Sequence, residues 1–216
     1  MSLDHDAFRA ARLVLSLRRA GVSDQRLVEA IETTPRELFV PRAFVENAWD
    51  DIELPIDCGQ SLTRPLMAGV MIQALGPRSH HRVLEIGCGS GYCTALLSRL
   101  SNAVFSMDRY RTLVARAGET LERLGASGVV LALGDGRLGW PEEAPFDRII
   151  VMGALEEPPD LLLAQLAPLG VGVIPLVRDG EQRLVRFERT GEGDLLETVL
   201  VRTRFTPLEA GFAREL

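Results

Sequence analysis

From residue 82 to residue 176, short apolar segments of strand length alternate with amphipathic segments of helix length. Strands are predicted at 82–86, 103–107, 129–133, 146–152 and 171–176, and helices at 92–100, 113–124 and 161–166. Parallel strands joined by helical crossovers produce such an alternation, which predicts a doubly wound, mostly parallel α/β sheet of the Rossmann-like kind. Segments 184–188 and 196–203, separated by the turn residues 190–194, predict an antiparallel hairpin at the C-terminal end.

Helical patterns precede this sheet. A helix is predicted over about the first 20 residues, with an apolar face formed by Phe8, Ala11, Leu15 and Ala20. Ser23 stands where its hydroxyl can cap a second helix. The apolar stripe of that helix consists of Leu27, Val28 and Ile31. These segments predict an N-terminal helical extension.

The segment Thr34–Glu37 predicts a short third helix that opens with a capping box between its first and last residues. From 41 to 65, prolines and glycines interrupt the chain and helical periodicity fades, which predicts an ordered loop. A long ordered loop inside a compact domain is commonly functional. A further helix is predicted to begin after Pro65.

Bulk composition disfavours several classes of protein. The formal net charge of −6 argues against a nucleic-acid partner, since phosphate binding needs a basic face. No apolar run approaches the ~18 residues of a transmembrane helix, so no membrane association is expected. The acidic start, Met1–Asp6, lacks the form of a secretory signal and predicts a cytoplasmic protein. Three cysteines and three histidines at no ligand spacing predict neither a disulfide framework nor a metal site.

A glycine cluster lies between the first strand of the alternation and the helix that follows it. Gly87, Gly89 and Gly91 allow a sharp turn there and a close approach of a ligand to the backbone. The helix that begins after the cluster presents free N–H groups and a partial positive charge. Glu85 stands at the end of the strand, directly before the cluster. The cluster therefore indicates a turn that can bind a nucleotide or nucleoside.

Two further acids support this interpretation. Asp108 ends the second strand, 21 residues after Gly87, where dinucleotide folds place an acid for ribose hydroxyls. Asp135 ends the third strand and is expected near an adenine edge. A nicotinamide dinucleotide usually brings GxGxxG and a pyrophosphate, and an NAD-dependent oxidoreductase is the competing class. Three carboxylates around one crevice favour S-adenosylmethionine instead, because that cofactor has no phosphate and carries positive charge.

The chain resembles the protein-L-isoaspartate O-methyltransferases over about residues 12 to 209. The segments that carry the resemblance are Val83–Tyr92, Pro35–Pro41, Leu54–Ile56, Gly59–Pro65, Gly134–Gly136, Pro145–Asp147 and Arg204–Leu208. Gly59–Pro65 is the specific one, because methyltransferases in general lack it. The resemblance implies S-adenosylmethionine-dependent methyl transfer to the free carboxyl of L-isoaspartyl residues in damaged proteins or peptides, a reaction of protein repair.

The resemblance also implies roles for particular residues. Thr63 takes the position of the family's active-site serine. The residues expected to bind the cofactor are Gln60, Ser61, Leu62, Glu85, Gly87, Gly89, Ser90, Gly91, Asp108, Arg109, Asp135 and Gly136. The residues expected to bind the substrate are Arg64, Trp49 and Met152.

Departures from the family pattern leave two alternatives open. The usual Thr-Ile-Ser-Gln reads Ser-Leu-Thr-Arg at 61–64, and Met152-Gly153 also differs from the family. The alternatives are a related methyltransferase that acts on a different carboxylate or peptide, and a non-catalytic S-adenosylmethionine-binding protein.

The length of 216 residues suits a single domain over 1–216. About 1–65 is expected to supply the N-terminal helices and the substrate or active-site loop, and about 66–216 the cofactor-binding α/β core. No oligomeric state follows from the sequence.

Overall fold

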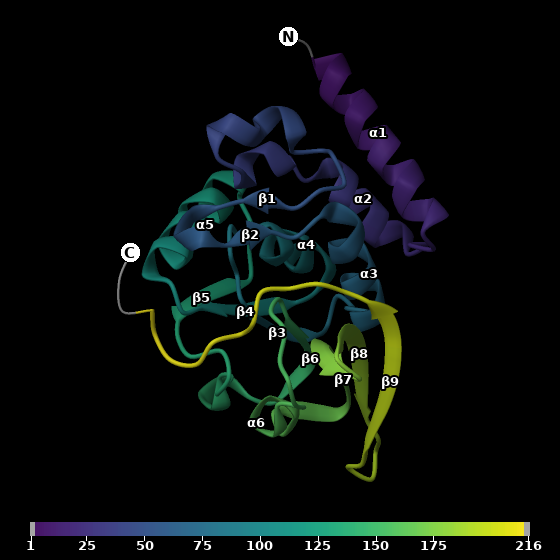
Figure 1. The fold of residues 1–216 in the computed structure, drawn as a ribbon, viewed down its shortest axis with the longest axis vertical. Coiled ribbons are helices and arrows are strands. Elements are labelled where there is room, and N and C mark those ends of the chain that lie inside the picture. The colour runs from purple at the N-terminus through teal and green to yellow at the C-terminus, as the bar shows by residue number, and fades with distance from the viewer. Residues whose placement is uncertain (1–2, 214–216) are drawn as a thin grey trace.

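A seven-stranded sheet lies at the centre of the computed structural model, which describes residues 3–213 (Figure 1). Its strands are β3 (Arg82–Ile86), β4 (Ala103–Asp108), β5 (Val129–Leu133), β6 (Phe146–Val151), β7 (Leu166–Arg178), β8 (Glu181–Arg189) and β9 (Leu195–Arg202). They lie in the order β5-β4-β3-β6-β7-β8-β9. β3 to β7 pair in parallel, whereas β8 pairs antiparallel with both β7 and β9. The predicted fold class, a mostly parallel sheet with a C-terminal antiparallel hairpin, is confirmed.

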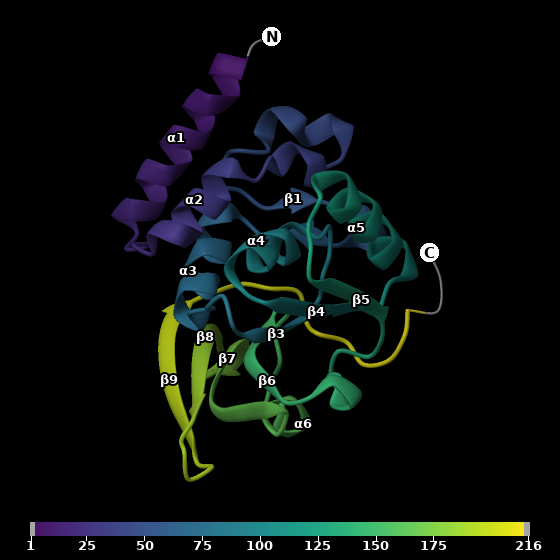
Figure 2. The ribbon, with the colours of Figure 1, turned by 180° about the vertical axis from the view of Figure 1, so that it is seen from behind.

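Helices cover the two faces of this sheet unequally. The helices are α1 (Leu3–Arg19), α2 (Gln25–Thr33), α3 (Pro65–Leu75), α4 (Tyr92–Leu100), α5 (Arg111–Leu124) and α6 (Asp160–Leu163). Val83 and Ile150 face the core that contains α1 to α4, and Leu84 and Ile149 face a second core that contains α6. Figure 2 shows α1 to α5 on one side of the sheet and α6 on the other. Within residues 3–213, no helix is long and apolar enough to cross a membrane.

The helix predicted at 161–166 is shorter than expected. α6 ends at Leu163, because Leu166 already pairs with Phe146 as the first residue of β7. β7 therefore begins at residue 166 and not at residue 171. In contrast, β3, α4 and β5 have the predicted bounds.

The predicted apolar face of the first helix is wrong, although the helix itself is present. Phe8 and Leu15 are 70% and 57% exposed. The residues that α1 buries are Ala10, Leu13 and Leu17. These residues are buried because α1 packs closely on α3. A Cβ at Gly69 of α3 would lie only 2.9 Å from the Leu17 side chain.

Two predicted helix caps are also wrong. Asp24, and not Ser23, caps α2, since its carboxylate accepts the N–H groups of Arg26 and Leu27. An acid one residue closer to the helix can reach two N–H groups. The capping box at Thr34–Glu37 does not form, because this segment makes only the 3₁₀ turn η1 (Arg36–Phe39) without a side-chain cap.

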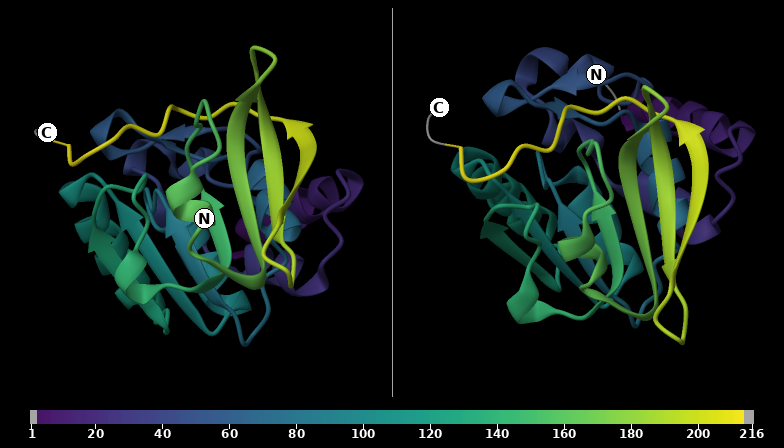
Figure 3. Two further views of the ribbon diagram at one scale, coloured as in Figure 1. Left: turned by 90° about the horizontal axis from the view of Figure 1, so that it is seen from below. Right: turned by 60° about the horizontal axis from the view of Figure 1, so that its bottom comes forward.

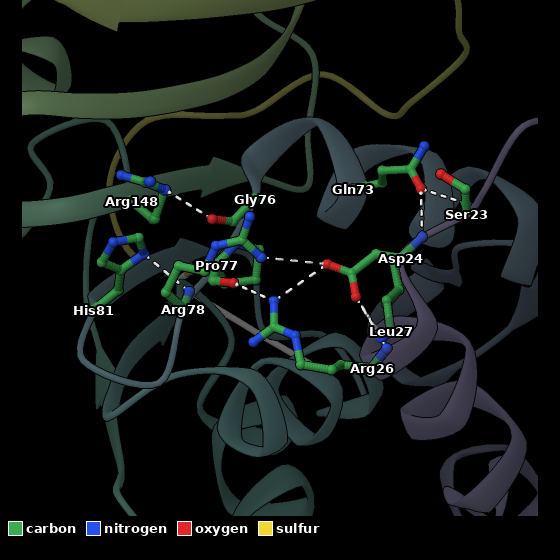
Figure 4. Close-up of polar contacts among 10 residues, drawn as sticks. All are labelled: Ser23, Asp24, Arg26, Leu27, Gln73, Gly76, Pro77, Arg78, His81 and Arg148. Atoms are coloured by element: carbon green, nitrogen blue, oxygen red, sulfur yellow. Dashed lines mark hydrogen bonds and ion pairs between the residues drawn. The ribbon is translucent and has the colours of Figure 1, made fainter.

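Polar contacts fix the amino edge of the sheet, where the strands begin (Figure 4). Gln73 of α3 accepts the N–H of Ser23 at 2.6 Å and donates to the carbonyl of Gly21 at 2.8 Å. The Nδ1 atom of His81 accepts the N–H of Arg78 at 3.0 Å. Burial lowers the pKa of His81 to about 4, so the ring stays a neutral acceptor. These contacts tie α2 and α3 to the start of β3.

The predicted loop from 41 to 65 is ordered and contains short elements. These are the 3₁₀ turns η2 (Arg42–Asn47) and η3 (Asp57–Gly59) and the strands β1 (Leu54–Pro55) and β2 (Ser61–Leu62). β1 and β2 pair antiparallel, with Leu54 opposite Leu62. After β9, the chain runs back across the carboxyl edge of the sheet, as Figure 3 shows. The loop and this C-terminal segment together enclose the candidate site.

Candidate active site

A cavity of about 730 Å³ opens at the carboxyl ends of β3, β4 and β6. This volume lies within the range of roughly 300–1,000 Å³ that is usual for small-molecule sites. Four segments supply most of its wall, namely the glycine turn 86–90, the loop 60–63, the start of α5 with the residues before it, and the C-terminal segment 204–209. Ligands of open α/β sheets bind at this kind of crevice.

The glycine turn gives a ligand access to the backbone. Gly87 has a φ of +89°, and a Cβ built there would lie 3.4 Å from the Cβ of Met152. A Cβ at Gly136 would lie 2.2 Å from Cγ2 of Ile86. The turn after β5 can therefore pack against the end of β3 only with glycine at this position. α4 begins after the glycine turn without a side-chain cap. The turn therefore leaves room where a cofactor must approach.

Asp108 lines the cavity and holds the glycine turn at the same time. Its carboxylate accepts the N–H of Gly89 at 3.0 Å and the N–H of Tyr110 at 3.1 Å. Burial raises the pKa of Asp108, and these backbone hydrogen bonds act in the opposite direction. A carboxylate can accept about four hydrogen bonds, which leaves acceptor sites for ligand hydroxyls.

Asp135 does not line the cavity. Its two oxygens accept the N–H groups of Arg137 at 2.9 Å and Gly211 at 2.7 Å. Arg109, which does line the cavity, donates through Nε to the carbonyl of Gly211 at 3.1 Å and contacts Glu209. The carboxylate of Asp135 thus lies against the C-terminal segment.

Glu85 is fully buried and is not part of the cavity wall. Its Oε2 accepts hydrogen bonds from the hydroxyls of Thr94 and Ser106, each at 2.5 Å. The Oε1 atom is buried without a partner. Burial raises the pKa of Glu85 to about 7, against the effect of the two hydroxyl hydrogen bonds. This carboxyl group therefore links β3 to α4 and β4 next to the cavity, without contacting its interior.

The loop that carries Thr63 forms another wall. The residues of this loop that line the cavity are Gln60, Ser61, Leu62 and Thr63. The side-chain nitrogen of Gln60 donates to the carbonyl of Cys58 at 3.2 Å. The backbone carbonyl of Thr63 accepts a hydrogen bond from the guanidinium of Arg36 at 2.8 Å. Arg36 thus fixes the backbone of Thr63 at the cavity wall.

The three residues predicted to bind substrate are placed differently from one another. Met152 lines the cavity. Arg64 lies outside it, with Nη1 3.6 Å from Oδ2 of Asp51 and 43% of the side chain exposed. Trp49 is packed in the core and is 7% exposed. Neither Arg64 nor Trp49 forms part of the cavity wall.

The segment Arg204–Leu208 carries part of the family resemblance, but no function was predicted for it from the sequence. In the structure, Arg204 lines the cavity and is exposed, without an ion pair to any residue between 3 and 213. The N–H of Ala154 donates to the carbonyl of Thr206 at 2.9 Å, and the N–H of Leu208 donates to the carbonyl of Ala154 at 2.8 Å. These two bonds anchor the C-terminal wall beside β6.

A doubly wound sheet with a glycine turn, an acid after the second strand and a cavity at their common edge defines the nucleoside-binding class of Rossmann-like enzymes. The model of the family "Protein-L-isoaspartate(D-aspartate) O-methyltransferase (PCMT)" matches residues 8–212. The chain belongs to this family, whose methyl donor is S-adenosylmethionine.

Several relatives support this assignment. The chain is 48% identical over 208 residues to a protein-L-isoaspartate O-methyltransferase of Maricaulis maris (strain MCS10). The aligned region covers 96% of this chain and 97% of that protein. It is 43% identical over 217 residues to the protein of that name from Parvibaculum lavamentivorans, which covers 99% of this chain and 97% of that protein.

Solved structures agree with the fold. A protein-L-isoaspartate O-methyltransferase with 28% identity superposes with a TM-score of 0.83, covering 94% of this chain and 67% of that one. A Plasmodium falciparum protein assigned to the same family, solved with S-adenosyl-L-homocysteine, has a TM-score of 0.77 at 23% identity. It covers 92% of this chain and 97% of that one.

Proposed function

We propose that this protein methylates the free carboxyl group of L-isoaspartyl residues in damaged proteins or peptides, with S-adenosylmethionine as the methyl donor. The observation that carries the proposal is the position of Thr63. In a chain of this family, Thr63 lines the same cavity that the glycine turn and Asp108 line. A cofactor site and an acceptor site would therefore share one enclosed space.

The residues present fit the cofactor. The turn at Gly87 and Gly89 leaves room for the backbone to meet a ligand, and Asp108 keeps acceptor sites for ribose hydroxyls. Apolar side chains of Met107 and Leu113 line the same cavity and suit an adenine ring. When bound, S-adenosylmethionine supplies an electrophilic methyl group. We propose Gln60, Ser61 and Leu62 of the neighbouring loop as further contacts of the cofactor.

The residues around the acceptor need to orient a carboxylate and exclude water, and they need not remove a proton. An isoaspartyl carboxyl with a pKa of ~3.9 is already ionised at neutral pH. The hydroxyl of Thr63 can donate a hydrogen bond to one carboxylate oxygen and so hold the other in line for attack. Arg204 lines the same cavity and can offset the negative charge of the acceptor. We propose this pair as the acceptor site.

The decisive experiment is a methylation assay with labelled S-adenosylmethionine and an isoaspartyl peptide. The control peptide has the same sequence with an ordinary aspartyl residue. We expect methyl ester on the isoaspartyl peptide only, and a rate on the order of 100-fold lower for Thr63→Ala with unchanged cofactor affinity. A wild-type protein that binds the cofactor and esterifies neither peptide would refute the proposal.

The same assay decides the alternative acceptors. Equal methylation of both peptides would favour a less selective carboxyl methyltransferase. Of the departures from the family pattern, Arg64 lies outside the cavity wall, whereas Thr63, Met152 and Gly153 line it, so this assay is needed to decide between the acceptors.

A further inference from the structure

Arg36 is a buried arginine for which core packing gives no reason. It is among the largest side chains of the fold with no exposed surface. No ion pair joins it to a carboxylate within residues 3–213, and its Nε and Nη1 atoms are buried without partners. A buried charge is costly unless it is paired and fully hydrogen-bonded. An apolar side chain of similar length would fill the same space at lower cost.

The contacts that Arg36 does make join two parts of the active site. Its Nη2 donates to the carbonyl of Thr63 at 2.8 Å. Its guanidinium carbon lies 4.7 Å from the ring centroid of Tyr92. Tyr92 is the first residue of α4 and follows the glycine turn directly. One side chain therefore spans the loop that carries the proposed hydroxyl and the helix that begins at the cofactor turn.

The surroundings hold this side chain in one orientation. The ring of Tyr92 packs edge-to-face on Phe39, with 5.4 Å between the ring centroids. Phe39 and Arg36 lie at the two ends of the turn η1, and both are buried. The guanidinium is thus fixed between the turn that carries it and the start of α4. Displacing it would free the carbonyl of Thr63.

We infer that Arg36 is a positioning residue for methyl transfer, which sets the place of the Thr63 hydroxyl relative to the cofactor turn. The inference rests on the proposed function. In-line transfer tolerates little displacement, since a shift of about 1 Å can lower a rate on the order of 100-fold. A flexible link at this point would lower the rate while leaving the cofactor contacts at Asp108 in place.

A double-mutant cycle with Arg36→Met and Thr63→Ala tests the inference. Methionine keeps an unbranched side chain but cannot donate to the carbonyl. We expect Arg36→Met to lower kcat by on the order of 10- to 100-fold, with the affinity for S-adenosyl-L-homocysteine changed by less than about threefold. In the Thr63→Ala background, where no hydroxyl remains to be positioned, the same change should lower kcat by less than about threefold.

Two outcomes would overturn the inference. One is an unchanged kcat in Arg36→Met, and the other is a double variant whose loss equals the product of the two single losses. A merely structural residue gives the second result, because lost stability does not depend on the Thr63 hydroxyl. Failure of the wild type to methylate the isoaspartyl peptide would instead refute the proposed function, so the two failures can be told apart.

Two additional variants serve as controls for effects on folding. Leu17→Ala removes a fully buried side chain of α1 that is not part of the cavity wall. We expect it to lower Tm without a comparable loss of kcat. If Arg36→Met does not fold, Arg36→Lys keeps the charge but loses the planar fork that reaches the carbonyl. The cycle is then run with Arg36→Lys, and the same criterion of non-additivity applies.

Discussion

The amino and carboxyl edges of the central sheet differ in how completely their buried polar atoms are satisfied. At the amino edge, none of the residues drawn in Figure 4 has a buried side-chain atom without a hydrogen-bond partner, and Arg189 at the end of β8 has one such atom. At the carboxyl edge, Arg36, Glu85, Ser90 and Tyr92 each have at least one such atom. Unsatisfied buried polar groups lower stability, so natural proteins keep them mainly where function requires them. Most of these unsatisfied atoms lie beside the cavity, so we expect substitutions at the amino edge to change stability and substitutions at the carboxyl edge to change activity.

The largest expected effect concerns the pH dependence of stability at Glu85. Its pKa is raised by burial to about 7 in the folded protein, from 4.5 in the unfolded chain. Between these pH values the folded state holds the extra proton, so stability falls as pH rises and stays lower above pH 7. Glu85→Gln removes this loss.

Urea unfolding at pH 4 and pH 8 checks this prediction. The stability of Glu85→Gln relative to the wild type should rise by on the order of 3 kcal/mol between the two pH values. A relative stability that is independent of pH would show that the carboxyl group is not perturbed. It would also weaken the contrast between the two edges.

Asp108→Ala should lower cofactor affinity by on the order of 10- to 100-fold, because it removes the hydrogen bond to the glycine turn and the proposed hydrogen bonds to ribose hydroxyls. Calorimetry with S-adenosyl-L-homocysteine measures the effect. Asp135→Ala is the matched control. Its carboxylate holds Gly211 outside the cavity, so the loss of affinity should be smaller. Equal losses would contradict the placement of these two acids.

Gln73→Ala examines the amino edge. Gln73 accepts two N–H groups and donates to one carbonyl, in partly exposed positions. Its removal should lower the free energy of unfolding by about 1–2 kcal/mol. The kcat for the isoaspartyl peptide, measured well below Tm, should not change. A loss of kcat that exceeds the loss of folded protein would mean that the two edges are coupled.

Arg64→Gln should have the smallest effect. The arginine pairs with Asp51 at the surface, and exposed pairs of this kind contribute little. We expect kcat/KM for the isoaspartyl peptide to stay within about twofold of the wild-type value. A larger fall would assign Arg64 to substrate binding after all, and a larger rise would show that it hinders the substrate.

Local patterns predicted the elements whose bounds depend on residues close by in the sequence. β3, α4 and β5 were placed with their observed bounds, because apolar periodicity and glycine stops act within a few residues. The face of α1 could not be placed in this way. Two apolar stripes compete on that helix, and only its contact with α3 selects the one with Leu13 and Leu17.

The site shows the same limit. The glycine turn and Asp108 were found because they are fixed by the ends of successive strands. The role of Arg36 was not predicted, since a charged residue in a short turn is usually exposed and its contact with Thr63 spans 27 residues. The C-terminal wall was missed for a related reason. An irregular segment after a hairpin has no periodicity that would indicate where it returns.

The C-terminal wall has a consequence for how the protein is made. Within residues 3–213, every named strand and helix ends before residue 203, yet residues 204–209 supply one side of the cavity. A nascent chain that has left the ribosome only as far as β9 has the whole sheet but an open site. The hydrogen bonds of Gly211 with Arg109 and Asp135 then anchor the segment that follows this wall.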